Sequence, residues 1–166
     1  MDPEPTLTAP APGQEVPRSV ADLTALVGRE LGPTRWVEVG QDRVDAFAEV
    51  TGDRQWIHLD VERAGASPMG GTIAHGLFTL SLGPAFTEEL FSFEGFAHAL
   101  NYGYEKVRFP APTPVGSRVR MTATITDVRP VTGGAQVTTT QIFHREGSDK
   151  PVCVAESVGR FVERQP

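Results

Sequence analysis

The stretch GLFTLSLGPAFTEEL, residues 76–90, decides the fold of this chain. Its apolar side chains occupy nearly every position instead of a single stripe. A helix that is hydrophobic on all sides is one that the rest of the protein buries. We therefore expect a buried central helix over residues 76–90, with Pro84 causing a kink or a break inside it.

The chain beyond this helix has the pattern of a sheet. It predicts four strands, over residues 97–109, 116–129, 134–146 and 151–163. Residues 119–125 alternate between apolar and polar side chains, which is the period of a strand with one buried face. The two glycines of VTGGAQ, residues 131–136, indicate a turn between two of these strands. The layout favours an α+β fold in which an antiparallel sheet wraps around the helix.

Shorter elements precede the central helix. The sequence predicts a helix capped by Ser19 with apolar positions up to Leu31, a strand over residues 35–39, a helix stopped by Gly52 and a brief helix capped by Asp60. Residues 1–17 are rich in proline and poor in large apolar side chains, so we expect a disordered tail there. Residues 18–166 are expected to form a single domain.

Composition excludes several classes of protein. The net charge of −6 and the scattered basic residues argue against a nucleic-acid-binding surface. Cys153 is the one cysteine, so the chain has no internal disulfide and no cysteine–histidine zinc spacing; its apolar surroundings predict a core position. No apolar run approaches the ~18 residues of a membrane span, and no basic-then-apolar leader is visible. We expect a cytoplasmic protein without membrane partners.

An acidic and a basic side chain flank two bulky apolar residues in TGDRQWIHLD, residues 51–60. We expect Asp53 and His58 to lie in a loop after the Gly52 helix end, where their side chains can converge. Histidine exchanges protons near neutral pH, and a nearby carboxylate can orient it or help it to hold a water. The spacing alone leaves two interpretations open, an acid–base pair at an apolar pocket or a structural histidine in a capped loop.

The segment TIAHGLF, residues 72–78, leads into the apolar helix. A helix start leaves backbone N–H groups without partners, and glycine lets a ligand approach the backbone closely. The N–H groups near Gly76 can therefore hold a carbonyl oxygen on which negative charge develops. The alternative is a glycine that only starts the helix, with His75 packed beside it.

Polar and basic side chains gather in residues 101–119. Asn101 and Tyr102 can hydrogen-bond a ligand or close the end of a strand. Lys106, Arg108 and Arg118 can contact phosphate groups. The more ordinary alternative for these three residues is a solvated strand face.

Three segments together resemble one known family. The stretch FAEVTGDRQWIHLDVERAGASPMGGTIAHGLFTLSL, residues 47–82, resembles the pattern of the MaoC-like (R)-specific enoyl-CoA hydratase and dehydratase family. The stretches NYGYEKVRFPAPTPVGSRVR, residues 101–120, and CVAES, residues 153–157, resemble its NodN-like subgroup. The resemblance covers roughly residues 20–163, all of the chain except the ends.

The resemblance implies a hot-dog fold, which is an antiparallel sheet wrapped around a long central helix, and a homodimer with active sites near the subunit interface. It implies that Asp53 and His58 are catalytic and that the backbone amide of Gly76 binds the substrate carbonyl. The residues expected to bind substrate are Gln55, His75, Leu77, Asn101, Tyr102, Lys106 and Arg108. The chain departs from the family at Gln55 and Trp56, where most members have Asn-Pro, and at Pro84, where many have a serine.

The expected reaction is the reversible hydration of trans-2-enoyl thioesters to (R)-3-hydroxyacyl thioesters. CoA, or the phosphopantetheine of a carrier protein, enters as part of the substrate, and no metal or redox cofactor is implied. Two alternatives stay open at this point: a hot-dog acyl-CoA thioesterase, and a non-catalytic subunit of a hetero-oligomer that binds acyl thioesters. The Asp–His pair favours the hydratase, since protons must move at two carbons.

Overall fold

The computed structural model describes residues 13–164 of the 166-residue chain. Its elements are α1 Val20–Ala25, β1 Glu30–Leu31, β2 Val37–Glu38, α2 Gln41–Thr51, α3 Trp56–Leu59, α4 Val61–Gly65, α5 Gly76–Ser81, α6 Gly83–Leu90, β3 Phe96–Arg108, β4 Arg118–Val131, β5 Gly134–Arg145 and β6 Cys153–Glu163. The predicted disordered tail, residues 1–17, lies mostly outside the described residues. Within its described end, Glu15 exchanges backbone hydrogen bonds of 2.8 Å with Leu90 and Ser92.

One antiparallel sheet forms the body of the protein. The strand order is β1-β4-β5-β6-β3, and β2 also pairs with β4. The four long strands match the four predicted from the sequence, with ends that differ by a few residues. Gly133, with φ of 78°, makes the predicted turn between β4 and β5. The expectation of an α+β fold with an antiparallel sheet is confirmed.

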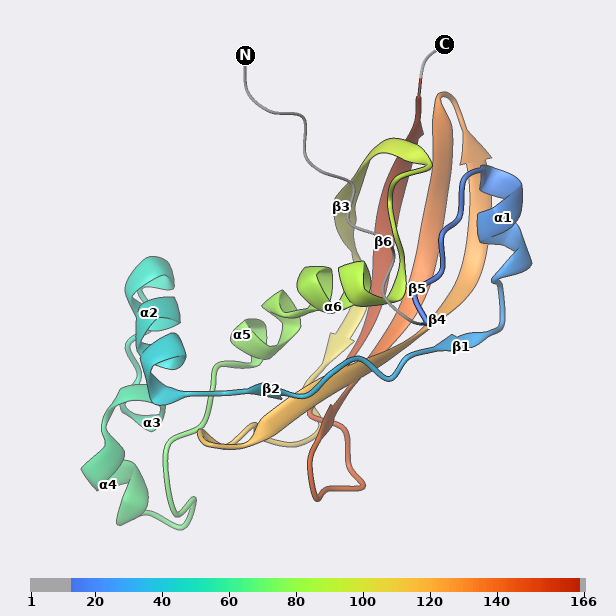
Figure 1. Cartoon of the computed structure of the whole chain (residues 1–166). Coiled ribbons are helices and arrows are strands. Elements are labelled where there is room, and N and C mark those ends of the chain that lie inside the picture. The colour runs from blue at the N-terminus through green and yellow to red at the C-terminus, as the bar shows by residue number, and fades with distance from the viewer. Residues whose placement is uncertain (1–12, 165–166) are drawn as a thin grey trace, which may run out of the picture.

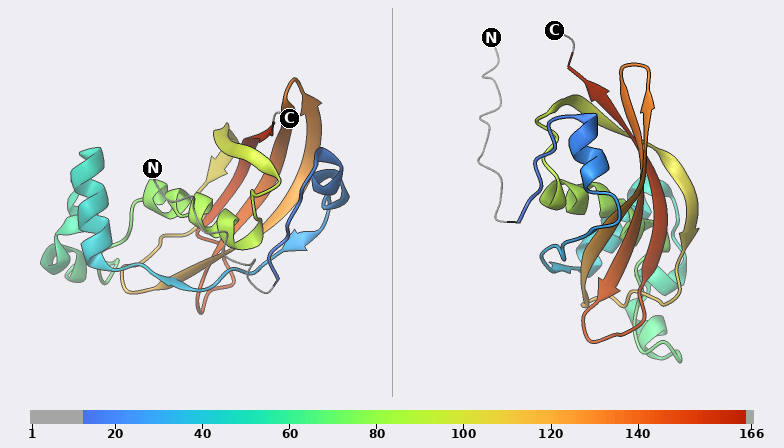
Figure 2. Two further views of the ribbon diagram at one scale, coloured as in Figure 1. Left: turned by 45° about the horizontal axis from the view of Figure 1, so that its top comes forward. Right: turned by 90° about the vertical axis from the view of Figure 1, so that its right-hand side faces the viewer.

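The apolar segment of residues 76–90 lies in the hollow of the curved sheet, as Figures 1 and 2 show. It is buried on one face only, since Leu77, Ser81, Pro84 and Ala85 are exposed, so the expectation of burial on all sides was wrong. It forms two consecutive helices, because α5 ends at Ser81 and α6 begins at Gly83 with Pro84 in its first turn. Proline has no N–H to donate and suits a first turn, so it starts the second helix. Among the helices of residues 13–164, none is both long and apolar enough to cross a membrane.

Packing of α6 on the sheet forms the centre of the core. The Phe86 side chain is 1% exposed, and its ring centre lies 6.2 Å from that of Phe143 on β5. Gly83 allows the close approach, since a Cβ there would lie 3.3 Å from the Gln141 side chain. Cys153 is buried in the same core, as predicted, and burial raises the pKa of its thiol to about 12.

The helix caps agree with the sequence, but one helix is shorter than expected. Ser19 accepts a hydrogen bond from the Asp22 amide at the start of α1, and Asp60 caps α4. The apolar spacing predicted a helix that continues toward Leu31. That prediction was wrong, because the chain leaves α1 after Ala25 and Leu31 pairs with Ala123 of β4. A buried apolar residue serves equally well on a helix face or in a short strand.

Replacing Phe86 by alanine is expected to lower the free energy of unfolding by about 3–5 kcal/mol, because a buried ring is lost and a cavity is left. Urea denaturation followed by circular dichroism measures this change. Val50→Ala is the control, since Val50 is 87% exposed on α2 and should change stability by less than about 0.5 kcal/mol. Equal effects of the two substitutions would contradict the packing described here.

Candidate active site

The turn after α2 places the first acidic group of the site. Gly52 ends α2 with φ of 77°, a left-handed conformation that glycine adopts without strain. The chain therefore reverses direction, and Asp53 follows with a partly exposed side chain. Its Oδ1 accepts long hydrogen bonds from the Gln55 amide at 3.5 Å and from Gln55 Nε2 at 3.3 Å. Gln55 thus contacts the carboxylate through both its backbone and its side chain.

His58 lies in a one-turn helix, and the expectation of a simple loop around it was wrong. The side chain is 5% exposed within α3. Its Nδ1 lies 2.6 Å from the Ile73 carbonyl oxygen. Because a carbonyl oxygen only accepts, Nδ1 carries the proton and Nε2 is left with a lone pair in the neutral ring. This tautomer leaves Nε2 able to exchange a proton with a ligand.

The segment before α5, residues 72–75, is hydrogen-bonded to chain on both of its sides. The Ile73 amide donates to the Ile57 carbonyl at 3.0 Å, and the Ala74 amide donates to the Thr113 carbonyl at 2.8 Å. The segment is therefore held from the α3 side and from the loop that joins β3 to β4. It ends at the N-terminus of α5, where Gly76 is the first helical residue.

His75 joins this segment to the Asp53 loop. Its side chain is 3% exposed, and its Nε2 lies 2.9 Å from the Asp53 carbonyl oxygen. The ring stacks on that of His58 with centres 3.7 Å apart, and the Phe47 ring lies 5.1 Å away. Two imidazoles and one carboxylate therefore meet at one place.

An open cavity of about 420 Å³ lies against these groups. It is lined by Phe47, Thr51, Asp53, Gln55, His58, His75, Gly76, Leu77 and Phe109. Proton-exchanging groups line one part of it, and apolar side chains line the rest. The arrangement suits a mostly apolar ligand whose reacting atoms must meet proton-exchanging groups.

Phe109 closes the cavity over the start of α5. A Cβ built on Gly76 would lie 2.9 Å from the Phe109 ring, which is closer than real contacts allow. Only a glycine therefore fits beneath the ring in this arrangement. The Gly76 amide lies in the first helical turn, where N–H groups have no partner inside the helix.

The three polar side chains also raise the question of a metal site. Asp53, His58 and His75 each offer one ligand atom, and these atoms lie within 4.8 Å of one another. A tetrahedral zinc ion about 2.0–2.1 Å from two ring nitrogens would hold the ring centres about 5 Å apart. The observed 3.7 Å stack with a 27° tilt does not fit that requirement. The geometry favours proton transfer over metal binding.

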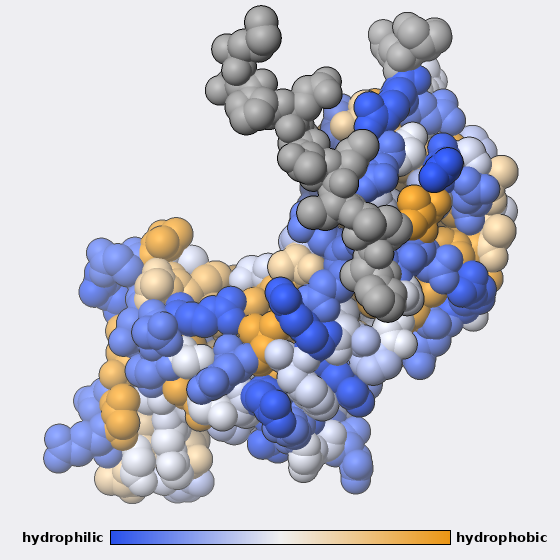
Figure 3. Space-filling model, in the orientation of Figure 1, coloured by the Kyte–Doolittle hydropathy of each residue, from blue (hydrophilic) through white to orange (hydrophobic). Residues whose placement is uncertain are grey.

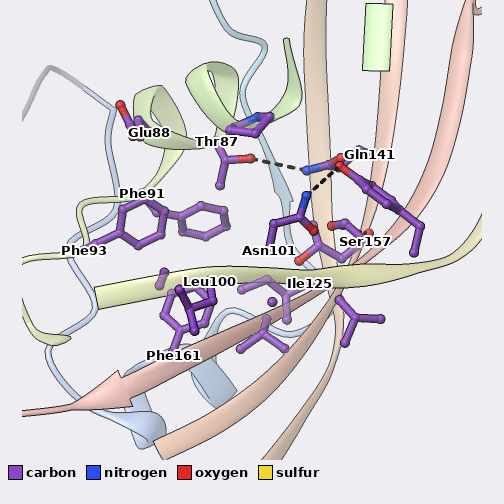
Figure 4. Close-up of a pocket in the computed structure, with 17 residues that line it drawn as sticks. Thr87, Glu88, Phe91, Phe93, Leu100, Asn101, Ile125, Gln141, Ser157 and Phe161 are labelled. Carbon is purple, nitrogen blue, oxygen red and sulfur yellow. Dashed lines mark hydrogen bonds between the residues drawn. The ribbon is translucent and has the colours of Figure 1, made fainter. Parts of the chain in front are cut away.

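A second cavity, of about 170 Å³, lies between α6 and the sheet (Figure 4). Aromatic and aliphatic side chains line one end, including Phe91, Phe93 and Phe161. At the other end Gln141 donates to Thr87 Oγ1 at 3.3 Å. The cavity is mostly apolar, and α6, the second helix of the segment that starts at Gly76, forms one of its walls.

The structure brings most of the expected site residues together. Asp53, Gln55, His58, His75, Gly76 and Leu77 all line the first cavity, whereas Asn101 lines the second. Three do not line either cavity. Tyr102 is 65% exposed under the Arg160 side chain, and Lys106 and Arg108 are exposed on β3.

The sequence analysis did not name three of the lining residues, Phe47, Thr51 and Phe109. Phe47 and Thr51 occupy the last turns of α2, immediately before the Asp53 loop, so their position was a usable signal. Phe109 follows the last residue of β3 and precedes a proline. The Phe109 side chain is 42% exposed, and nothing in the local sequence shows that it lies over Gly76.

Comparison with known proteins gives a consistent set of relatives. Residues 22–146 match the family described as MaoC like domain. The chain is 50% identical over 145 residues to 3-hydroxyacyl-thioester dehydratase Z of Mycobacterium tuberculosis, covering 87% of this chain and 96% of that protein. It is 46% identical over 109 residues to nodulation protein N of Rhizobium leguminosarum, covering 61% and 65% of the two chains.

Solved structures agree on the fold. The unliganded R-hydratase PhaJ1 from Pseudomonas aeruginosa superposes with a TM-score of 0.71 at 20% identity, covering 88% of this chain and 86% of that one. The (R)-hydratase of A. caviae, involved in PHA biosynthesis, gives a TM-score of 0.67 at 23% identity, covering 80% and 94%. At such identities the likeness shows the hot-dog fold.

Gly76→Ala is expected to displace the Phe109 ring, because the added methyl group would lie 2.9 Å from it. Thermal unfolding of Gly76→Ala, Phe109→Leu and the double variant measures the effect. The two changes should be non-additive, with a coupling energy of about 0.5–3 kcal/mol.

Gly65→Ala is the control for this cycle, since nothing lies within 4 Å of a Cβ at Gly65. Its effect should add to that of Phe109→Leu. Additivity for Gly76→Ala as well would show that Phe109 does not lie over the helix start.

Proposed function

The chain belongs to the MaoC-like domain family, and from this premise we propose how it acts as a hydro-lyase that interconverts (R)-3-hydroxyacyl thioesters with trans-2-enoyl thioesters and water. The observation that carries the proposal is the meeting of Asp53, His58 and the Gly76 amide around one cavity. Together these groups meet the requirements of the reaction: removal of a proton from the water that bonds to C3, delivery of a proton to C2, and stabilisation of charge on the thioester oxygen.

Asp53 and His58 act together to accept a proton and to return one. In the hydration direction, a water bound between the Asp53 carboxylate and His58 Nε2 loses a proton to the pair as its oxygen bonds to C3. The π electrons of the C2–C3 double bond move toward the thioester, which becomes an enolate. The pair then returns a proton to C2, so the enzyme ends in its starting protonation state. The Ile73 carbonyl holds His58 in the Nδ1–H tautomer, which leaves Nε2 free to accept the proton of the water.

The Gly76 amide stabilises the charge that develops on the thioester oxygen. Donors already in place where negative charge forms lower the barrier without any reorganisation during the reaction. Phe109 lies over this position and keeps the carbonyl site apolar. A side chain at residue 76 would displace that cover, which accounts for glycine there.

The acyl chain extends along the α5–α6 pair. Gly76 and Thr87 are eleven positions apart in the chain, which corresponds to roughly 16 Å of helix axis. The apolar cavity of Figure 4 lies at that far end and offers room for the tail of a longer acyl group. The carrier, CoA or a phosphopantetheine arm, is part of the substrate, and the cytoplasm stays our prediction for the compartment.

Asp53→Asn and His58→Gln are expected to lower the hydratase rate by about 10²–10⁴, because each removes a positioned proton-transfer group. The assay follows the loss of enoyl-thioester absorbance with crotonyl-CoA and then with longer enoyl-CoAs. Asp60→Asn is the matched control, since this exposed carboxylate only caps α4. Its activity should equal that of the wild type.

Wild-type rates in both Asp53→Asn and His58→Gln would contradict the assignment of the pair. Release of free thiol from a saturated acyl-CoA, without hydration, would indicate a thioesterase instead. The chain-length profile of the wild type reports whether the second cavity accepts the acyl tail.

We further propose a homodimer that forms through β3. This 13-residue strand pairs with β6 on one side, and no strand among residues 13–164 pairs with its other side. An unpaired edge is a template for another strand. Leu100 and Tyr102 on β3 are 53% and 65% exposed, and Leu77 in α5 is 62% exposed. Hydrophobic patches also lie on the lobe formed by α2, α3 and α4 (Figure 3).

Light scattering after size exclusion should give a dimer for the wild type, and the Leu100→Lys/Tyr102→Lys variant should dissociate at least tenfold more readily, because like charges would face each other across the edge. Val50→Lys, an exposed apolar position on α2, is the control and should stay dimeric. A wild-type monomer at assay concentration would refute the dimer but leave the site untouched.

A further inference from the structure

His75 has an environment that neither substrate binding nor simple core packing explains. The side chain is 3% exposed and sits between two rings, with His58 at 3.7 Å and Phe47 at 5.1 Å between centres. One nitrogen, Nε2, bonds to the Asp53 carbonyl at 2.9 Å. The other, Nδ1, is buried and has no hydrogen-bond partner among the described residues.

The Asp53 bond fixes the tautomer of His75. A carbonyl oxygen has no proton to give, so Nε2 must be the donor. The donor therefore bonds to the backbone carbonyl of Asp53 and not to its carboxylate. His75 thus fixes the position of Asp53, since a hydrogen bond to the backbone carbonyl holds the loop whatever the carboxylate binds.

The segment that carries His75 also holds the second member of the pair. Ile73, two residues earlier, accepts the hydrogen bond from His58 Nδ1. Ile73 and Ala74 are themselves bonded to Ile57 and Thr113 through their amides. One short, doubly anchored segment thus holds the Asp53 backbone by one side chain and the His58 ring by one carbonyl. The Asp53 loop and the His58 ring are therefore both tied to this one segment.

We propose that His75 is a positioning residue that aligns the acid–base pair. Its Nε2–H holds the Asp53 loop, and its ring face sets the plane of the His58 imidazole, so that both groups reach the same water. This role rests on the proposed function, since alignment has a kinetic meaning only if Asp53 and His58 transfer protons. It needs no contact between His75 and the substrate.

Two substitutions separate the parts of this role. His75→Gln keeps an N–H donor at a distance from the backbone similar to that of Nε2, but it lacks the ring. His75→Phe keeps a ring to stack on His58, but it has no donor. His144→Gln is the control, since His144 lies on the sheet and bonds to Thr122.

With crotonyl-CoA, His75→Phe is expected to lower kcat by about 10–100-fold, because small displacements of catalytic groups have effects of that size. KM should stay within about threefold, since the substrate contacts are unchanged. His75→Gln should lower kcat by only about two- to fivefold, because its amide replaces the hydrogen bond and only the stacking on His58 is lost. The control should match the wild type, and circular dichroism should show folded protein in every case.

A double variant tests whether His75 acts through Asp53. In the Asp53→Asn background, His75→Phe should lower kcat by less than about threefold more, since residues that act as a unit are non-additive. Full additivity would overturn the proposal. So would an unchanged kcat in His75→Phe, or a rise in KM that accounts for the whole effect, which would indicate direct substrate contact.

Hydrogen–deuterium exchange separates this proposal from the proposed function. Exchange at residues 52–55 should rise at least tenfold in His75→Phe and should stay near the wild-type rate in His75→Gln, because local opening follows the lost hydrogen bond. This holds even if the wild type hydrates no enoyl thioester. Unchanged exchange in His75→Phe would overturn the positioning role whether or not the protein is active.

Discussion

Backbone hydrogen bonds on both sides hold the segment Thr72–Ala74, and the geometry of the cavity depends on that segment. Ile73 pairs with Ile57 on one side, and Ala74 pairs with the loop between β3 and β4 on the other. The helix α5 begins two residues later, so its first turn is placed by the same bonds. This one anchored stretch of chain, with the adjoining His75, thus contacts the His58 ring and the Asp53 backbone and places the start of α5.

The helices α5 and α6 in the hollow of the sheet both fill the core and leave space for the second cavity. Phe86 and its neighbours fill the core, and Gly83 lets the helix approach Gln141 and Phe143 closely. Pro84 begins the second helix at the same point, so α5 and α6 can each follow the curved sheet. The resulting space beside α6 is the second cavity, lined by apolar side chains at one end and by amide and hydroxyl groups at the other.

The strands and caps followed from local patterns, and the errors have a common cause. Alternation marked β4 because that strand has a largely buried face, whereas β3 is mostly exposed along its length. The left-handed Gly52 ended α2 where expected. Leu31 and His58 were assigned to the wrong elements. An apolar residue fits a helix or a strand, and a single helical turn such as α3 has no period to detect. In both cases, pairing or packing with distant residues decided the outcome.

The sequence alone determined the central helical segment, the sheet around it, and the residue types that can carry acid–base chemistry, because hydrophobic periodicity and side-chain chemistry are local properties. Which face of that segment is buried was decided by the tertiary structure. The sequence also named six of the residues that line the first cavity. Only the tertiary structure decided that His75 binds the backbone of Asp53, that Phe109 lies over Gly76, and that Lys106 and Arg108 line neither cavity. These facts depend on contacts between segments far apart in the chain, and no spacing within one segment encodes a distance to another.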